Sequence, residues 1–255
     1  MKISLTTGIQ YTHLSNSFES IQKIFAGDTH SIHKARNELK IIELDGIKTV
    51  VKSFKVPHLL NRIVYTYFRK SKAYKSYHNA LRLEELGIST PKPIALIEFF
   101  EAGLLGESFF IAEYFEYDFT IRTPLLEPLE DREAIFKAFA AYTYNLHQKG
   151  VWHLDYSPGN ILIKRAEEGY HFSIVDINRM EFRPITALEG CENFNKLWAS
   201  DEELEIMGRE YACLSGFNVA ATITEMKKHN DANKRVKNFK KRLKNLLKGN
   251  FSTPA

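Results

Sequence analysis

The order of apolar and polar positions predicts strands in the first part of the chain and helices in the rest. A helix is predicted over about residues 71–86, because its apolar spacing is helical and Gly87 is a suitable C-cap. Asp45-Gly46 is a strong hairpin turn signal between two β-branched or apolar runs. The predicted strands cover residues 39–43, 49–54, 94–99 and 108–114. This β-β-α-β-β order predicts a small antiparallel sheet with one helix.

The pattern becomes helical after the fourth strand. Helical apolar spacing runs from 129 to 149, a short hairpin turns at Glu168-Gly169, and residues 192–248 are helical in character throughout. A polar, proline-containing segment separates the two parts. The predicted domains are therefore an N-terminal lobe, residues 1–116, and a larger, mainly helical C-terminal lobe, residues 117–255, with a cleft between them.

Composition changes this interpretation little. The chain has 255 residues with 44% hydrophobic and 26% charged residues, which is typical of a globular protein and long enough for two lobes. It has neither the apolar core of a secretory leader nor a run of about eighteen apolar residues, so we expect a cytoplasmic protein. Cys191 and Cys213 lack metal-ligand spacing and predict neither a zinc site nor a disulfide framework.

Charge is concentrated near the C-terminus. Residues 227–248 hold ten Lys or Arg against the single acid Asp231, so most of the chain is acidic although its net charge is +4. Val236, Phe239 and Leu243 recur at helical spacing, which predicts an amphipathic basic helix. This helix either is solvated or binds an anionic surface such as lipid headgroups or a phosphorylated glycan. No nucleic-acid motif accompanies it, so no nucleic-acid partner is expected.

One loop indicates the chemistry. The sequence His-Leu-Asp-Tyr-Ser-Pro-Gly-Asn starts at His153, and Asp176 ends the next apolar strand sixteen residues after Asn160. Phosphoryl transfer needs a group that accepts the proton of the acceptor hydroxyl, and divalent metal on the phosphates. Asp155 would be that base, and Asn160 and Asp176 would bind Mg²⁺. We expect His153 to brace the loop rather than to act as an acid or base.

The first lobe supplies the candidate nucleotide-binding residues. Lys52 ends a Val-Val-Lys run and would reach the phosphates of ATP, whereas Lys48 and Lys55 compete less well for this role because neither ends such a run. Val50 shares the face of Lys52 and would cover the adenine. No glycine-rich loop precedes Lys52, so side chains such as Arg36 would replace part of its phosphate cradle.

These elements resemble the protein-kinase-like superfamily and, within it, the bacterial lipopolysaccharide kinases, which phosphorylate Kdo or heptose sugars of the inner core. The resemblance extends over about residues 30–250. It implies a two-lobed α+β fold, ATP and Mg²⁺ as cofactors, and a lipopolysaccharide or lipid A–core precursor as partner. It also implies that Glu113 to Phe115 form the interlobe hinge that binds adenine. The segments that indicate the subgroup are residues 36–40, 68–73, 87–91 and 153–155 with Asn160.

Two departures from the protein-kinase pattern bear on the acceptor. Asp176 is followed by Ile-Asn instead of Phe-Gly, and no Ala-Pro-Glu follows, so a phosphorylation-controlled activation segment is not evident. Ser157 stands where protein serine/threonine kinases commonly carry a lysine. Both favour a small or glycan acceptor over a protein.

A third departure concerns the acid that should pair with Lys52. The middle of the predicted helix has His78, and Glu84 and Glu85 come late. Either one of these acids reaches back, or His78 takes the acidic position and the lysine is held otherwise, or the enzyme is impaired.

We therefore expect an ATP-dependent kinase for a sugar hydroxyl of the lipopolysaccharide inner core. Its basic helix and residues 62–75 would bring it peripherally to the inner membrane, although the aromatic residues near 62–70 also suit packing within the lobe. Three alternatives remain: a small-molecule kinase of aminoglycoside or choline type, a protein kinase, and a pseudokinase scaffold that binds nucleotide.

Overall fold

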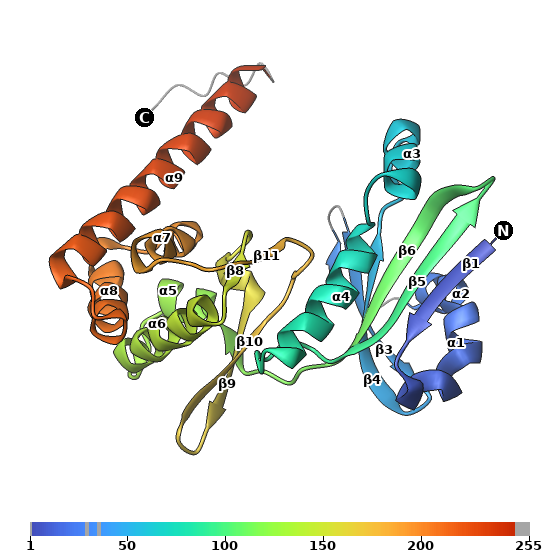
Figure 1. Cartoon of the computed structure of the whole chain (residues 1–255), viewed down its shortest axis with the longest axis horizontal. Coiled ribbons are helices and arrows are strands. Elements are labelled where there is room, and N and C mark those ends of the chain that lie inside the picture. The colour runs from blue at the N-terminus through green and yellow to red at the C-terminus, as the bar shows by residue number, and fades with distance from the viewer. Residues whose placement is uncertain (1, 29–30, 35–36, 248–255) are drawn as a thin grey trace. The chain divides into compact units, whose positions relative to one another are not determined.

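The computed structural model describes residues 2–28, 31–34 and 37–247, and it divides into two compact units (Figure 1). The first unit contains Met1–Glu116 and Ser173–Met180, and the second contains Tyr117–Phe172 and Glu181–Ala255. The segment of Asp176 thus packs with the first unit. The functional lobes, 1–116 and 117–255, stay a prediction.

A six-stranded antiparallel sheet forms the centre of the first unit, in the order β1-β5-β6-β4-β3-β2. Asp45 and Gly46 both have positive φ, +46° and +82°, as a type I′ hairpin turn requires, which confirms the turn predicted there. The strands are β1 Lys2–Thr7, β2 Ser31–Lys34, β3 Asn37–Leu44, β4 Ile47–Phe54, β5 Pro93–Glu101 and β6 Leu104–Glu113.

Helices cover both faces of this sheet. On one face, Leu14, Phe18 and Ile21 pack with strand residues such as Val51 and Phe109. On the other face, Ala73 and Tyr77 of α4 pack with Phe54 and Leu96. The helical segments are η1 Ile9–Leu14, α1 Ser15–Glu19, α2 Ile21–Gly27, α3 Leu59–Tyr67 and α4 Lys72–Glu85.

The first unit therefore has more helices than the single one predicted. That prediction corresponds to α4, and the structure adds α1, α2 and α3. Tyr11, Leu14, Phe18, Ile21 and Phe25 are all buried and recur every three or four residues, so the signal for α1 and α2 was present in the sequence.

The second unit is mainly helical. Short strands form the sheets β10-β9-β7 and β11-β8. The last residues of β10 and the first residue of β11 belong to the first unit. Its elements are β7 Phe119–Thr120, α5 Arg122–Leu126, α6 Arg132–Gln148, β8 Val151–His153, η2 Pro158–Asn160, β9 Ile161–Ala166, β10 Gly169–Ile174, β11 Met180–Phe182, α7 Ala187–Gly190, η3 Cys191–Lys196, α8 Asp201–Ser215 and α9 Val219–Leu247.

Local signals explain where these helices begin and end. Ser200 and Glu203 form a reciprocal capping box at the start of α8, and Gly216, with φ +68°, ends it. Glu203 is buried and pairs with Arg132 at the start of α6, so the cap also ties two helices together. None of the helices formed by the described residues is long and apolar enough to span a bilayer.

Candidate active site

The first unit brings Lys52 and Asp176 together. Lys52 Nζ lies 2.5 Å from Asp176 Oδ1, although the two residues are 124 positions apart. The Lys52 side chain is only 10% exposed, whereas that of Asp176 is 33% exposed. Phe54, two residues along β4, places its ring 5.3 Å from the ammonium. A largely buried cation therefore faces a carboxylate that solvent and ligands can reach.

Hydrogen bonds fix the loop that carries Asp176. Thr90 Oγ1 donates to Ile174 O at 2.8 Å, and Asn79 Nδ2 of α4 donates to Ile177 O at 2.7 Å. Asn178 Nδ2 also donates to Asp176 Oδ1 at 2.6 Å. Asp176 itself has φ +56°, a left-handed conformation that is uncommon outside glycine and typical of constrained functional positions.

Val50, the predicted adenine cover, lies in a row of apolar residues on three neighbouring strands. It shares the face of Lys52 on β4, and its partners across the sheet are Ile41 on β3 and Ala112 on β6. Val50 and Ile41 are half-buried and Ala112 is buried, so the three strands form one apolar row beside Lys52. Ile41 was not singled out from the sequence, because its position opposite Val50 depends on the hairpin register.

The implied hinge residues begin at Glu113, the last residue of β6. Glu113 accepts a 2.5 Å hydrogen bond from Tyr11 Oη, and burial together with this carboxylate raises the pKa of Tyr11. The Glu113 N–H donates to Lys92 O, and the Tyr114 N–H donates to Lys48 O. Phe115 follows as half-buried chain outside any helix or strand.

The remaining predictions for this unit concern Arg36 and the acidic partner of Lys52. Arg36 lies outside the described residues. Glu85 pairs with Arg82 at 2.7 Å. The His78 ring packs against the Tyr74 ring at a tilt of 35°, with ring centroids 4.0 Å apart, and burial lowers the pKa of His78. The carboxylate that pairs with Lys52 in the described structure is that of Asp176.

In the second unit, the loop after β8 positions Asp155 through its backbone. The Asp155 N–H donates to His153 Nδ1 at 3.0 Å. The Asp155 carbonyl accepts from the Ser157 N–H at 2.7 Å and from Asn160 Nδ2 at 2.8 Å. Tyr156 is fully buried and its hydroxyl lies 3.0 Å from Thr143 Oγ1. These contacts shape the loop through main-chain atoms, and the Asp155 side chain is 35% exposed and accessible to a ligand.

A buried chain of hydrogen bonds supports this loop from behind. Asn193 Nδ2 donates to His153 O at 3.0 Å, so Asn193 Oδ1 is the acceptor for His147 Nε2 at 3.1 Å. His147 Nδ1 then accepts from Tyr211 Oη at 2.8 Å. Burial lowers the pKa of His147 to about 4, so the neutral tautomer with its proton on Nε2 satisfies the whole chain.

Lys196 is a candidate site residue that sequence reasoning missed. Its Nζ donates a hydrogen bond to Leu154 O and lies 3.9 Å from Asp155 Oδ1. It comes from η3, forty-one residues after Asp155, so no local spacing could connect the two. A lysine ammonium thus stands beside the candidate base even though Ser157 replaces the usual loop lysine.

The donor atoms near these loops suit Mg²⁺. Magnesium is held by one or two carboxylates together with substrate phosphates, rather than by a complete protein cage. Asp176 provides a carboxylate. Asn160 Nδ2 donates to Asp155 O, so the Asn160 Oδ1 atom points away from this carbonyl and could be a metal ligand. No group of three or more His, Cys, Asp or Glu gathers around a common point in the described residues, as a structural metal site would require.

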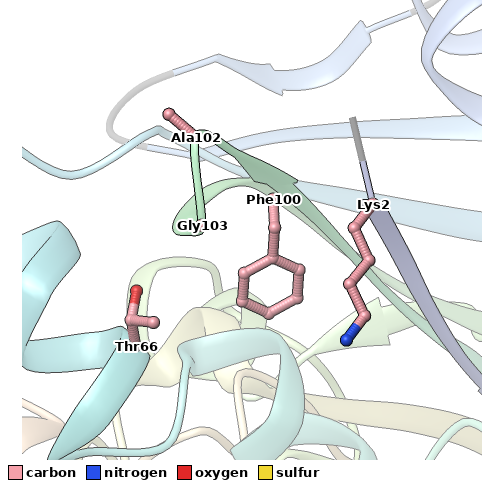
Figure 2. A pocket seen from close by; sticks show the side chains of 5 residues that line it. All are labelled: Lys2, Thr66, Phe100, Ala102 and Gly103. Carbon is pink, nitrogen blue, oxygen red and sulfur yellow. The ribbon is translucent and has the colours of Figure 1, made fainter.

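One hollow in the first unit lies away from Lys52. It has a volume of about 510 Å³ and is lined by Lys2, Thr66, Phe100, Ala102 and Gly103 (Figure 2). Ala102 and Gly103 form the β5–β6 turn, at the opposite end of β6 from the hinge residues. The hollow therefore does not coincide with the face of Lys52 and Val50 that is the candidate nucleotide-binding face.

Comparison with known proteins assigns the family. The model of the lipopolysaccharide kinase (Kdo/WaaP) family matches residues 51–216, which include Lys52, Asp155, Asn160 and Asp176. The chain belongs to this lipopolysaccharide kinase family. It is accordingly a phosphotransferase with an alcohol group as acceptor. No curated protein matches it.

A solved structure agrees on the fold. The structure described as "WaaP in complex with acyl carrier protein" is similar over 90% of this chain and 99% of that chain, with a TM-score of 0.63 and 16% identity. The predicted two-lobed, protein-kinase-like α+β fold is confirmed. At this identity the likeness concerns the fold alone, so the roles of individual residues stay predictions.

Proposed function

We propose that this lipopolysaccharide kinase transfers the γ-phosphate of ATP to a hydroxyl of an inner-core sugar, either Kdo or heptose. The observation that carries the proposal is the ion pair of Lys52 with Asp176, because a cation and a metal-binding carboxylate are both needed at the phosphates. Family membership supports the lipopolysaccharide acceptor.

In the proposed mechanism, each unit supplies part of the chemistry. Val50 covers the adenine, the backbone from Glu113 to Phe115 binds its edge, and Lys52 binds the phosphates. Asp155 accepts the proton of the sugar hydroxyl. The hydroxyl oxygen bonds to the γ-phosphorus while the bond between this phosphorus and the bridging oxygen of ADP breaks. Mg²⁺, held by Asn160 and Asp176, would neutralise charge on the phosphates.

The test compares acceptors directly. Purified protein is incubated with ATP, Mg²⁺ and lipid A–core that lacks inner-core phosphate, and mass spectrometry measures the gain of one phosphate. Water-soluble aminoglycosides, choline and a protein lysate serve as competing acceptors. Transfer to the core sugar alone supports the proposal. Phosphorylation of another class, or nucleotide binding without transfer to any acceptor, would overturn it.

We also propose that the enzyme binds an anionic membrane surface. The outer part of α9 exposes Val236, Phe239 and Leu243 among its basic residues, with 51%, 66% and 46% of each residue accessible. α3 has no buried residue. Its Leu60 and Tyr67 are 79% and 68% exposed, and its C-cap residue Phe68 is 79% exposed. Apolar side chains combined with cations are suited to a surface with anionic headgroups.

Vesicle binding tests this role. Vesicles with about 30% anionic lipid should retain the wild type in sedimentation, more weakly as salt rises, whereas neutral vesicles should not. A triple Lys240→Gln, Lys241→Gln, Arg242→Gln variant should lose most of this binding. Equal retention of both proteins on anionic vesicles would exclude the basic helix from the role.

The solved relative, which was captured with acyl carrier protein, suggests a protein partner as well. From that likeness, we infer that an acyl carrier protein is a candidate partner of this chain. Isothermal titration with purified acyl carrier protein, in its apo and acylated forms, tests the inference. Absence of heat with both forms at two temperatures and a protein concentration of about 100 µM would remove this partner, because a specific complex of even micromolar affinity would saturate and its enthalpy changes with temperature.

A further inference from the structure

A groove of about 330 Å³ opens beside Asp155, and every residue that lines it belongs to the second unit. Its wall includes Arg122 of α5, Lys196 of η3 and Lys237 of α9. Trp198, in the loop after η3, is part of the same wall. Asp155 is the only carboxylate among the lining residues, so three cations face one candidate base. The sign of this charge favours an anionic occupant.

Arg122 lies close to the catalytic loop. A Cβ placed on Gly159 would be 3.4 Å from an Arg122 guanidinium nitrogen, so the side chain lies directly against η2. Gly159 precedes Asn160, the candidate metal ligand. A planar guanidinium at this place can bind a carboxylate or a phosphate with two parallel hydrogen bonds.

Trp198 is held in an unusual conformation. Its φ is +60°, which is rare for a bulky side chain, and the residue is 47% exposed. Its neighbours Leu197 and Ala199 are buried, 3% and 0% exposed. The strained backbone thus keeps a large aromatic ring accessible beside the loop of Asp155.

The first half of α9 anchors this loop. Asn230 Nδ2 and Lys234 Nζ both donate to Ala199 O, at 3.1 and 2.8 Å, and Asn233 Nδ2 donates to Asn195 O at 2.8 Å. Lys237 lies on the same helix face, three residues after Lys234, four after Asn233 and seven after Asn230. The helix therefore fixes the position of Trp198 and brings a lysine into the groove.

We propose that this groove is the acceptor site and that it takes an anionic sugar. The pyranose ring stacks on Trp198, its carboxylate or phosphate pairs with Arg122 and Lys237, and its reacting hydroxyl faces Asp155. Lys196, already bonded to Leu154 O, borders the same space. This inference rests on the proposed sugar-kinase function and adds the charge of the sugar and the residues that bind it.

Steady-state kinetics with a matched control tests the groove. Lys237→Gln and Trp198→Ala should each raise KM for the lipid A–core acceptor by about 5- to 20-fold, the loss expected for one charged hydrogen bond or one stacked ring. KM for ATP should change by less than about twofold, because the nucleotide residues lie on other elements. Arg235→Gln removes a cation from another side of α9 and should change neither constant.

Two acceptors identify the anionic group. With a core whose sugar carboxylate is reduced to an alcohol, the effect of Lys237→Gln should disappear if the carboxylate is the partner. With a core that lacks its other phosphates, the effect should disappear if a phosphate is the partner. Either outcome supports the groove. Persistence of the effect with both acceptors, or an unchanged KM for the natural one, would overturn it.

Direct binding separates the groove from the proposed function. NMR titration of free Kdo and of a sugar phosphate needs no turnover, and weaker binding to Lys237→Gln than to Arg235→Gln would support the groove even in a preparation that phosphorylates no core sugar. Equal binding to the two variants would refute it while the kinase assay still succeeded.

Discussion

Replacing Asp155 by asparagine tests the candidate base with little change in shape. The backbone of Asp155 makes bonds that shape the loop: its N–H binds His153 Nδ1, and its carbonyl binds Ser157 and Asn160. The carboxylate is 35% exposed and lies 3.9 Å from Lys196 Nζ. An exposed ion pair of this kind contributes at most about 1 kcal/mol, so the free energy of unfolding should change by less than that.

The expected kinetic effect is much larger. Loss of a positioned general base lowers turnover by about 10²- to 10⁴-fold, which corresponds to about 2.7–5.4 kcal/mol of transition-state stabilisation. Initial rates of phosphate transfer from labelled ATP to lipid A–core measure this loss, and urea titration measures stability. The matched control is Asp231→Asn, which removes an exposed carboxylate from α9 and should leave both quantities unchanged.

The result that refutes this reasoning is specific. If Asp155→Asn retains turnover within about tenfold of the wild type at equal stability, a 10² effect is absent and Asp155 is not the base. If turnover and stability fall together, the loop depends on the carboxylate, and the attribution of its shape to backbone bonds is wrong.

Three further predictions concern Lys52, His147 and Gly190. Lys52→Met removes the buried partner of Asp176 and should lower kcat/KM by about 10²- to 10³-fold and abolish the thermal shift with ATP and Mg²⁺. Burial lowers the pKa of His147 to about 4. Between pH 6.5 and 4, the His147 imidazole is therefore protonated in the unfolded chain but stays neutral in the folded chain. The free energy of unfolding should therefore fall between pH 6.5 and 4, by up to about 3 kcal/mol, in urea titrations, and His147→Gln should flatten the profile. In Gly190→Ala the new Cβ would clash with Tyr211 Oη and should cost about 1–3 kcal/mol in the same titrations, whereas Gly27→Ala meets no atom within 4 Å and should be nearly neutral.

The features of the candidate site whose local arrangement the sequence predicted are those encoded by short spacing. Asp155 and Asn160 are five residues apart, and one turn of backbone brings the Asn160 side-chain amide to the Asp155 carbonyl. Lys52 and Val50 alternate on one strand, so their common face follows from the period of a strand. The predicted turn at Asp45-Gly46 likewise needs only two residues with positive φ.

The parts that the sequence could not predict depend on contacts between distant elements. Asp176 pairs with Lys52 because Thr90 and Asn79 hold its loop against the first unit. The expectation that an acid of the helix at residues 71–86 pairs with Lys52 was based on the lysine–glutamate pair of protein kinases. In this chain the middle of α4 instead provides Asn79, a side chain that binds the loop backbone. Lys196 reaches Asp155 through the packing of η3, which no spacing rule describes.

The basic C-terminal helix shows why a charge count overstates a binding surface. Lys227 already pairs with Asp201 and Glu205. Lys228 pairs with Glu225, and Lys234 donates a hydrogen bond to the backbone carbonyl of Ala199.

Farther along the same helix, Lys237 faces the groove, whereas Lys240, Lys241 and Arg242 are exposed cations next to Phe239. The local excess of positive charge is therefore divided among contacts within the fold, the groove beside Asp155 and the outer surface. Neutralising the outer residues alone should therefore separate the proposed membrane binding from catalysis, whereas neutralising the whole run should also disturb folding and the proposed acceptor groove.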